Sequence, residues 1–98
     1  MAESKNNLPK VLQKLRKLKH LSQEDFSIVS SRTYLSTLER GLQSPTVEKL
    51  EQLATVYGVS VPAMLILAFS LKRAGNFDRA VVHGFVEEAI HIIESSEQ

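Results

Sequence analysis

Residues 21–41, with the sequence LSQEDFSIVSSRTYLSTLERG, constrain the fold of this chain more than any other stretch. They are typical of two short helices joined by a tight polar turn at residues 30–31. Ser22 has the position of an N-cap for the first helix. This helix is predicted to point Phe26 and Ile28 inward.

The second of these helices is predicted to begin after a capping Ser31, to stop at Gly41 and to turn Leu35 and Leu38 inward. Its outward positions hold Arg32, Thr33, Tyr34 and Thr37. A small fold gains no stability by presenting these groups together at a helix N-terminus, but they match the phosphates and base edges of DNA. The pattern therefore favours sequence-specific DNA binding.

Apolar residues at helical spacing predict four more helices. Their approximate ranges are 8–19, 47–57, 61–74 and 77–93. Thr46 and Ser60 stand at capping positions before the second and third of them. No stretch is typical of a strand, so the sequence predicts an all-α fold.

The composition narrows the class of protein. A chain of 98 residues is long enough for one domain with a single core, and the absence of cysteine excludes disulfides and thiolate-based zinc sites. The longest apolar run, residues 61–69, is too short to cross a bilayer, and the N-terminus lacks the core of a signal peptide. A protein of the reducing cytoplasm is expected.

The net charge of +1 hides an asymmetry along the chain. Residues 1–45 carry eight Lys/Arg and four Asp/Glu, which gives +4, whereas residues 46–98 carry four and seven, which gives −3. A basic half beside an acidic half suggests one surface that meets an anion and another with a different task.

Several spaced motifs occur in a fixed order. They are Leu21-Ser22-Gln23-Glu24, Ser31-Arg32-Thr33-Tyr34-Leu35-Ser36, Leu38-Glu39-Arg40-Gly41, Ser44-Pro45-Thr46, and Leu53-Ala54 leading into Tyr57-Gly58-Val59-Ser60. With these motifs the sequence resembles the phage-repressor (Cro-like, or XRE) helix-turn-helix family over about residues 8–66. The Arg-Thr-Tyr triplet is most similar to the controller proteins of restriction–modification operons. The resemblance implies a five-helix repressor-type domain, here with an additional C-terminal helix.

In this family the third helix enters the major groove and the second lies across the DNA backbone. Carried over residue by residue, the resemblance implies that Arg32, Thr33, Tyr34 and Thr37 face base edges. It further assigns phosphate or loop contacts to Gln23, Ser36, Arg40, Gln43 and Ser44. The alternatives are that Arg32 is an ordinary solvated charge and that Tyr34 packs back on the domain.

The resemblance also implies a mostly buried ion pair between Arg16 and Glu39 that ties the first helix to the third. The sequence departs from the family at one place. Members usually have about two more residues between the positions of Gln23 and Arg32, often with a glycine in the turn. We therefore expect a shorter second helix here.

A single recognition helix contacts too few base pairs to select one site in a genome, and proteins of this fold read palindromes as two-fold dimers. The last two helices carry more apolar surface than one small core requires. The predicted dimer residues are Leu65, Phe69, Phe77, Val81, Phe85, Val86, Ile90 and Ile93. The alternative is that the last helix folds back on its own domain.

Nothing in the sequence is arranged for catalysis, so no enzymatic activity and no cofactor are expected. His83, Glu87 and His91 follow one another at four-residue spacing and could hold zinc, but such a stripe is more often the solvated side of a helix. We therefore expect no metal site.

The sequence predicts a flexible N-terminus over residues 1–7, a DNA-binding domain over residues 8–73 and a C-terminal dimerisation helix over residues 74–98. The expected function is that of a dimeric repressor on a palindromic double-stranded DNA operator, regulated through its concentration, the operator layout or a partner protein. One alternative is an antitoxin that binds a toxin protein and regulates its own operon. Another is a protein-interaction module that has lost DNA binding.

Overall fold

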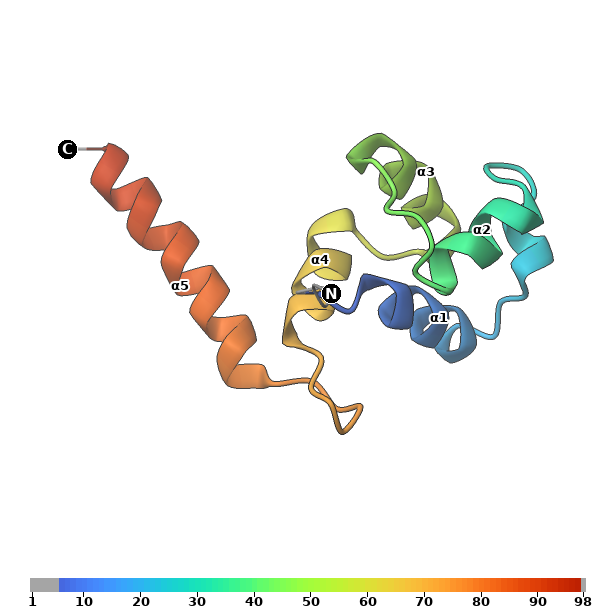
Figure 1. Cartoon of the computed structure of the whole chain (residues 1–98). Helices are drawn as coiled ribbons and strands as arrows, with labels where there is room; N and C mark the ends of the chain where they lie inside the picture. Colours follow the sequence, from blue (N-terminus) through green and yellow to red (C-terminus); the bar gives the residue numbers. More distant parts are fainter. Residues whose placement is uncertain (1–5, 98) are drawn as a thin grey trace.

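Five α-helices and one short 3-10 helix build the computed structural model, which describes residues 6–97 (Figure 1). They are α1 (Leu8–Leu18), η1 (Gln23–Phe26), α2 (Arg32–Glu39), α3 (Val47–Tyr57), α4 (Val61–Ser70) and α5 (Arg79–Ser96). Over residues 6–97 extended pairing is limited to one isolated bridge, between Leu71 and Phe77. The predicted all-α fold is therefore confirmed.

Helices α1 to α4, with η1, form the body of the molecule around one hydrophobic core. The buried apolar residues are Val11, Leu12, Leu15, Phe26, Leu35, Leu38, Leu50, Leu53, Tyr57, Met64 and Ala68. The rings of Phe26 and Tyr57 meet at a centroid distance of 4.7 Å. Because every element from α1 to α4 contributes to this core, the orientation of α2 is set by its neighbours.

Side-chain caps define the start of the helices that follow η1. Ser31, Thr46 and Ser60 each accept a hydrogen bond from the third helical amide, as predicted. Asp78 caps α5, and its carboxylate accepts from the backbone N–H groups of residues 80 and 81. These caps explain why the helices begin where the sequence places them.

The predicted second helix is reduced to the single 3-10 turn η1, and the inward position predicted for Ile28 is wrong. Phe26 is fully buried, but Ile28 is 85% exposed. The reason is local: η1 ends at Phe26, and the backbone N–H groups of Val29 and Ser30 both bond to the Phe26 carbonyl. This tight turn rotates residue 28 away from the core.

The last two helices also differ from the predicted ranges. Helix α4 ends at Ser70, because Leu71 is extended and pairs with Phe77. Phe77 therefore precedes α5, and it packs against the core of its own chain. The α5 helix begins two residues later than predicted and continues to Ser96.

Of the predicted flexible N-terminus, residues 1–5 lie outside the described part of the chain. Asn7 is fixed to the body: its backbone N–H donates to the Ala68 carbonyl at 2.8 Å and its side-chain amide to the Leu71 carbonyl at 3.0 Å. The start of α1 is thereby tied to the end of α4.

Helix α5 projects from the body and contains no buried residue (Figure 1). The radius of gyration is 14.9 Å, compared with about 13 Å for a compact chain of this length. Of the residues described, no single helix is long and apolar enough to cross a membrane, although the pair α3 and α4, bent by 98°, has the length and composition to do so.

Candidate nucleic-acid interface

Helix α2 is held in place by its buried side. Leu35 and Leu38 belong to the core, and Glu39, at the end of the helix, is buried as well. The hydroxyl of Ser31 accepts from the Tyr34 backbone N–H at 3.0 Å and fixes where the helix starts. The opposite side of α2 is therefore presented to the outside in a defined orientation.

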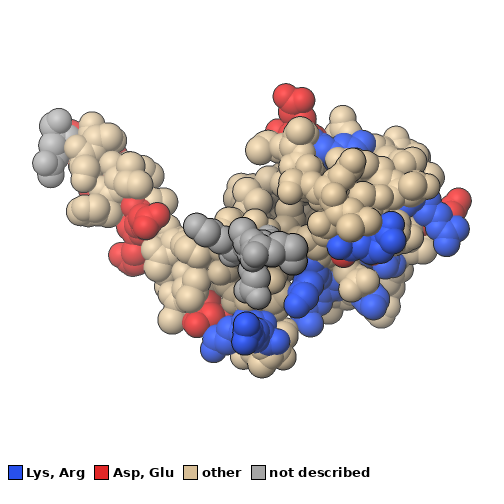
Figure 2. Space-filling model, viewed as in Figure 1, with Lys and Arg blue, Asp and Glu red and all other residues tan. Residues whose placement is uncertain are grey.

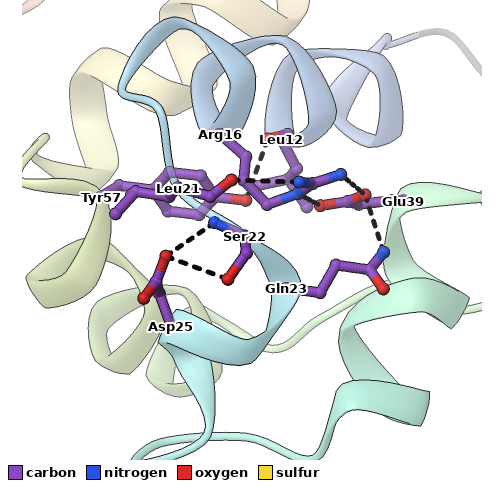
Figure 3. Close-up of polar contacts among 8 residues, drawn as sticks. All are labelled: Leu12, Arg16, Leu21, Ser22, Gln23, Asp25, Glu39 and Tyr57. Carbon is purple, nitrogen blue, oxygen red and sulfur yellow. Dashed lines mark hydrogen bonds and ion pairs between the residues drawn. The ribbon is translucent and has the colours of Figure 1, made fainter.

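The ion pair between Arg16 and Glu39 joins α1 to α2 (Figure 3). The Arg16 Nε donates to one carboxylate oxygen at 2.7 Å and the Nη2 donates to the other at 3.0 Å. The exposed fractions of the two side chains are 14% and 2%, so the pair is mostly buried, as predicted. The hydrogen bond to Glu39 raises the pKa of Arg16 above its usual value.

Further polar contacts extend this pair to the segment between α1 and α2 (Figure 3). The Nη1 of Arg16 donates to the Leu21 carbonyl at 3.1 Å, and the side-chain amide of Gln23 donates to Glu39 at 3.2 Å. The left-handed backbone of His20 (φ 58°) turns the chain at the end of α1. This turn brings the carbonyl of the next residue, Leu21, to the guanidinium of Arg16. One arginine thus fixes η1 and α2 relative to α1.

The outward side of α2 carries the residues predicted to face base edges. Arg32 and Thr33 are exposed, and so is Arg40 just beyond the last helical residue. Ser36 and Thr37 are half-buried, and the Thr37 hydroxyl donates to the Thr33 carbonyl at 2.8 Å, which leaves its oxygen able to accept. Helical spacing therefore places these residues on one side of α2, away from its core-facing leucines.

Tyr34 lies at the edge of this surface and is half-buried against the core. Lys49 of α3 holds its Nζ 5.3 Å from the centroid of the Tyr34 ring. The ring is therefore held between the body and a cation, and the alternative that Tyr34 packs partly back on the domain describes its position well. Lys49 was not among the residues predicted from the sequence.

The N-terminal end of α2 borders a shallow polar recess of 460 Å³. Its lining residues are Arg16, Ser22, Gln23, Glu24 and Arg32. Arg32 lies 4.0 Å from Glu24, but both side chains are 75% exposed, so this contact holds the guanidinium only weakly. The Gln23 amide, predicted to contact phosphate, is half-buried and bonded to Glu39 through its nitrogen.

The C-terminal end of α2 borders a second, more apolar groove of 620 Å³ between the start of α1, the loop after α2 and the start of α3. Arg40, Gln43 and Ser44 line it, and all three are exposed. The residues predicted to contact DNA thus lie on α2, on η1 before it and on the loop after it.

Charge is distributed unevenly over the molecule. In Figure 2 the blue Lys and Arg side chains gather over the body and the α4–α5 connection, whereas the projecting α5 is mostly tan with patches of red Asp and Glu side chains. Within Arg79–Ser96 there are three glutamates and one arginine. A polyanion is therefore attracted to the body rather than to α5.

A separate apolar surface lies on α5 and the end of α4. Its exposed residues are Phe69, Val81, Phe85, Val86, Ile90, Ile92 and Ile93. The rings of Phe69 and Phe85 meet edge to face at 6.3 Å, which anchors the start of α5 to α4. We call these seven residues the α5 apolar surface.

Two of the predicted dimer residues do not belong to that surface. Leu65 and Phe77 are half-buried and pack against the core of their own chain. Leu65 lies on the side of α4 that lines the groove beside α1, and Phe77 is fixed by its bridge to Leu71. Conversely, Ile92 is exposed on α5 although it was not among the predicted dimer residues.

His83, Glu87 and His91 are all exposed along α5. Over residues 6–97, no group of three or more His, Cys, Asp or Glu side chains is arranged to hold a metal ion. Burial raises the pKa of one core group, the Tyr57 hydroxyl, with a further contribution from the Glu39 charge. Tyr57 donates to the Leu12 carbonyl at 3.0 Å, so it is a structural group of the body.

Comparison with known proteins matches a helix-turn-helix family model to residues 12–63. The chain is similar to the ImmF control region 10 kDa protein of Bacillus phage phi105, with 31% identity over 67 residues that cover 66% of this chain and 74% of the phage protein. It is also similar to an uncharacterised HTH-type transcriptional regulator of Sinorhizobium fredii, with 49% identity over 49 residues, 48% of this chain and 64% of that relative. No solved structure matches significantly.

Proposed function

We propose that this chain, because it belongs to the XRE-type helix-turn-helix family of DNA-binding transcriptional regulators, acts as a dimeric repressor that reads a palindromic operator through the major groove. One observation carries the proposal: α2 buries Leu35, Leu38 and Glu39 and turns a row of arginine and hydroxyl side chains outward.

Base reading is assigned to the exposed start of α2. An arginine can donate two hydrogen bonds to guanine, and threonine hydroxyls both donate to and accept from base edges. Arg32, Thr33 and Thr37 have these roles in our proposal, and the half-buried Tyr34 is assigned to base reading beside them. The Arg16–Glu39 pair keeps α2 at a fixed angle to the body, so these side chains approach the groove together.

Phosphate contacts are assigned to the residues around α2. Arg40 is an exposed cation at its C-terminal end, and Gln43 and Ser44 follow in the loop. Ser36 lies beside this row, and Gln23 has a carbonyl oxygen and a second amide proton beyond its bond to Glu39. Such contacts fix the register of the protein on the duplex and carry no sequence information themselves.

Dimerisation is assigned to residues 74–98, and DNA binding to residues 8–73. The α5 apolar surface supports this division, because its seven large apolar residues are all exposed and extensive exposed apolar surface marks interaction sites. The projection of α5 from the body argues against the alternative that the helix folds back on its own domain. A second copy of the chain would cover this surface isologously and place two α2 helices about 34 Å apart, one turn of DNA.

Repression is favoured over activation by the simplest physical route, in which a dimer on an operator excludes other proteins from the same DNA. The phage relative is named a control region protein and the bacterial relative a transcriptional regulator, which supports a regulatory role; the cytoplasm is the compartment that we propose for it. The specific role of a restriction–modification controller, and the alternative role of an antitoxin, stay predictions from the sequence.

Selection from a random-sequence duplex library tests the proposal. The full chain should enrich a sequence with two inverted half-sites whose centres are about 10 base pairs apart, and footprinting should protect both halves. An enriched sequence with one unrepeated half-site would contradict the dimer. The absence of any enrichment would contradict sequence-specific binding and leave a protein-interaction role.

A further inference from the structure

Lys49, in the first turn of α3, makes three contacts with its ammonium group. The Nζ donates to the Val29 carbonyl at 2.7 Å and to the Gln52 side chain at 3.3 Å, and it lies 5.3 Å from the centroid of the Tyr34 ring. Two of these partners belong to the helix-turn-helix unit itself. Val29 is in the turn before α2, and Tyr34 is in the first turn of α2.

The turn that Lys49 contacts is short and contains no glycine. Two of its backbone donors are already used, because the N–H groups of Val29 and Ser30 both bond to the Phe26 carbonyl. The Val29 carbonyl points the other way and accepts from α3. A side chain from a third helix therefore fixes the carbonyl two residues before the N-cap of α2, and with it the direction in which α2 starts.

The same ammonium group restrains a side chain of the interface. Tyr34 is half-buried, with its ring packed on the edge of the core and covered by Lys49. A cation over a ring face is attracted to it and restricts the ring to fewer orientations. Lys49 of α3 thus helps to set the orientation of the Tyr34 ring.

We propose that Lys49 is a positioning residue for base recognition, which orients α2 and the Tyr34 ring, and is not a phosphate ligand. This role rests on the proposed function of α2 as the base-reading helix. A lysine has three donor protons, and here the ammonium group is engaged by a backbone carbonyl, a side-chain amide and a ring on its own chain. A phosphate would have to compete with these three partners for the ammonium group, of which the Val29 carbonyl, at 2.7 Å, is the closest.

The test compares two affinities for each variant at several salt concentrations. One probe is the duplex that the wild-type chain selects from a random library, and the other is a scrambled duplex of the same length and composition. Lys49→Met keeps most of the aliphatic stem and removes the donor. Arg73→Met removes one positive charge from the exposed connection between α4 and α5 and serves as the matched charge control.

Lys49→Met should lower the ratio of selected to scrambled affinity by about tenfold, the effect of one misplaced base contact. The slope of log affinity against log salt should stay the same, because no phosphate contact is lost. Arg73→Met should leave the ratio unchanged. Lys49→Arg, which keeps a donor and a cation over the ring, should stay within about threefold of the wild-type ratio.

Two results would overturn the role of Lys49. One is an unchanged ratio in Lys49→Met. The other is an equal loss on both probes together with a salt slope that is smaller by about one, which identifies a phosphate ligand. Circular dichroism melting checks that the variants are folded, and Lys49→Gln replaces Lys49→Met if the latter is not.

A second variant tests whether Lys49 acts through Tyr34. In a double-mutant cycle with Tyr34→Leu, the double variant should lose less specificity than the sum of the two single variants. Additive losses would contradict the link to the ring. If the wild-type chain enriches no sequence at all, the proposed function fails, and the role of Lys49 fails with it; an enriched sequence with an unaffected Lys49→Met ratio overturns the inference alone.

Discussion

Leu53 and Ile90 are both branched aliphatic residues in the middle of a helix, yet Leu53 in α3 is fully buried and Ile90 in α5 is 44% exposed. The body, from α1 to α4, covers its apolar residues with its own helices. Helix α5 contacts α4 near its start and leaves most of its apolar side uncovered. The body is therefore stabilised within the chain, whereas the apolar side of α5 is the surface that we propose a second copy of the chain covers.

The two regions also differ in charge and in hydrogen bonding. The body contains a mostly buried ion pair with a bidentate geometry, and the buried Tyr57 hydroxyl bonds to a backbone carbonyl. On α5 the charged groups are exposed glutamates and one arginine. Substitutions of charged residues in the body should therefore change folding or base reading, whereas matched substitutions of the exposed charged residues on α5 should not.

Glu39→Ala is expected to have the largest effect. It leaves Arg16 mostly buried without its carboxylate, so the free energy of unfolding should fall by roughly 3 kcal/mol or more. Denaturant unfolding followed by circular dichroism measures this loss. The same substitution at Glu88 of α5, which is exposed, should change stability by less than about 0.5 kcal/mol. Equal effects at the two positions would show that the buried ion pair of the body stabilises the fold no more than an exposed charge on α5.

The next effect concerns DNA reading by the body. Arg32→Ala should cost about 1–3 kcal/mol of binding free energy and relax the preference at one base pair. Arg40→Ala should instead weaken binding to all sequences similarly and lower the salt dependence. Arg79→Ala, at the start of α5, is the control and should leave base preference intact. An equal loss on selected and random DNA for Arg32→Ala would remove its base-reading role.

The smallest effect concerns the Tyr57 hydroxyl. Tyr57→Phe removes its hydrogen bond to Leu12 and should cost about 1 kcal/mol at neutral pH. Burial raises the pKa of Tyr57 above the ordinary value of 10.0, so above that pH the unfolded chain loses a proton that the folded chain keeps. This contribution to stability is complete below pH 10 and declines above it by about 1.4 kcal/mol per pH unit.

Measuring unfolding of both proteins between pH 8 and about pH 11 isolates this contribution, because the other titrating groups are shared and cancel in the difference. The stability advantage of the wild type over Tyr57→Phe should shrink above pH 10. A difference that stays constant across this range would show that the Tyr57 hydroxyl titrates alike in the folded and unfolded chains.

Much of the body could be predicted from the sequence, because its signals are local. The capping residues Ser31, Thr46 and Ser60 lie at the start of their helices, and the apolar spacing identified α1 and α3 correctly. Ile28 could not be placed by periodicity, since a single 3-10 turn follows neither the spacing nor the length of an α-helix.

The rest depends on contacts between residues far apart in the chain. Lys49 reaches a carbonyl 20 residues earlier, and nothing in its own sequence neighbourhood indicates this contact. Phe77 has the spacing of an α5 residue, but its pairing with Leu71 keeps it outside the helix. The assignment of individual DNA contacts came from the resemblance, and it stays a prediction for each side chain.

In the proposed dimer the α5 apolar surface is covered by a second copy of the chain, and operator binding depends on this pairing. Sedimentation of the full chain and of Ile90→Asp at micromolar concentration measures this pairing. The wild type should sediment at twice the chain mass of 11.0 kDa, and Ile90→Asp should sediment as a monomer with the same helical content and weaker operator binding. A wild-type chain that stays monomeric under these conditions, yet binds its selected operator tightly as a monomer, would contradict it.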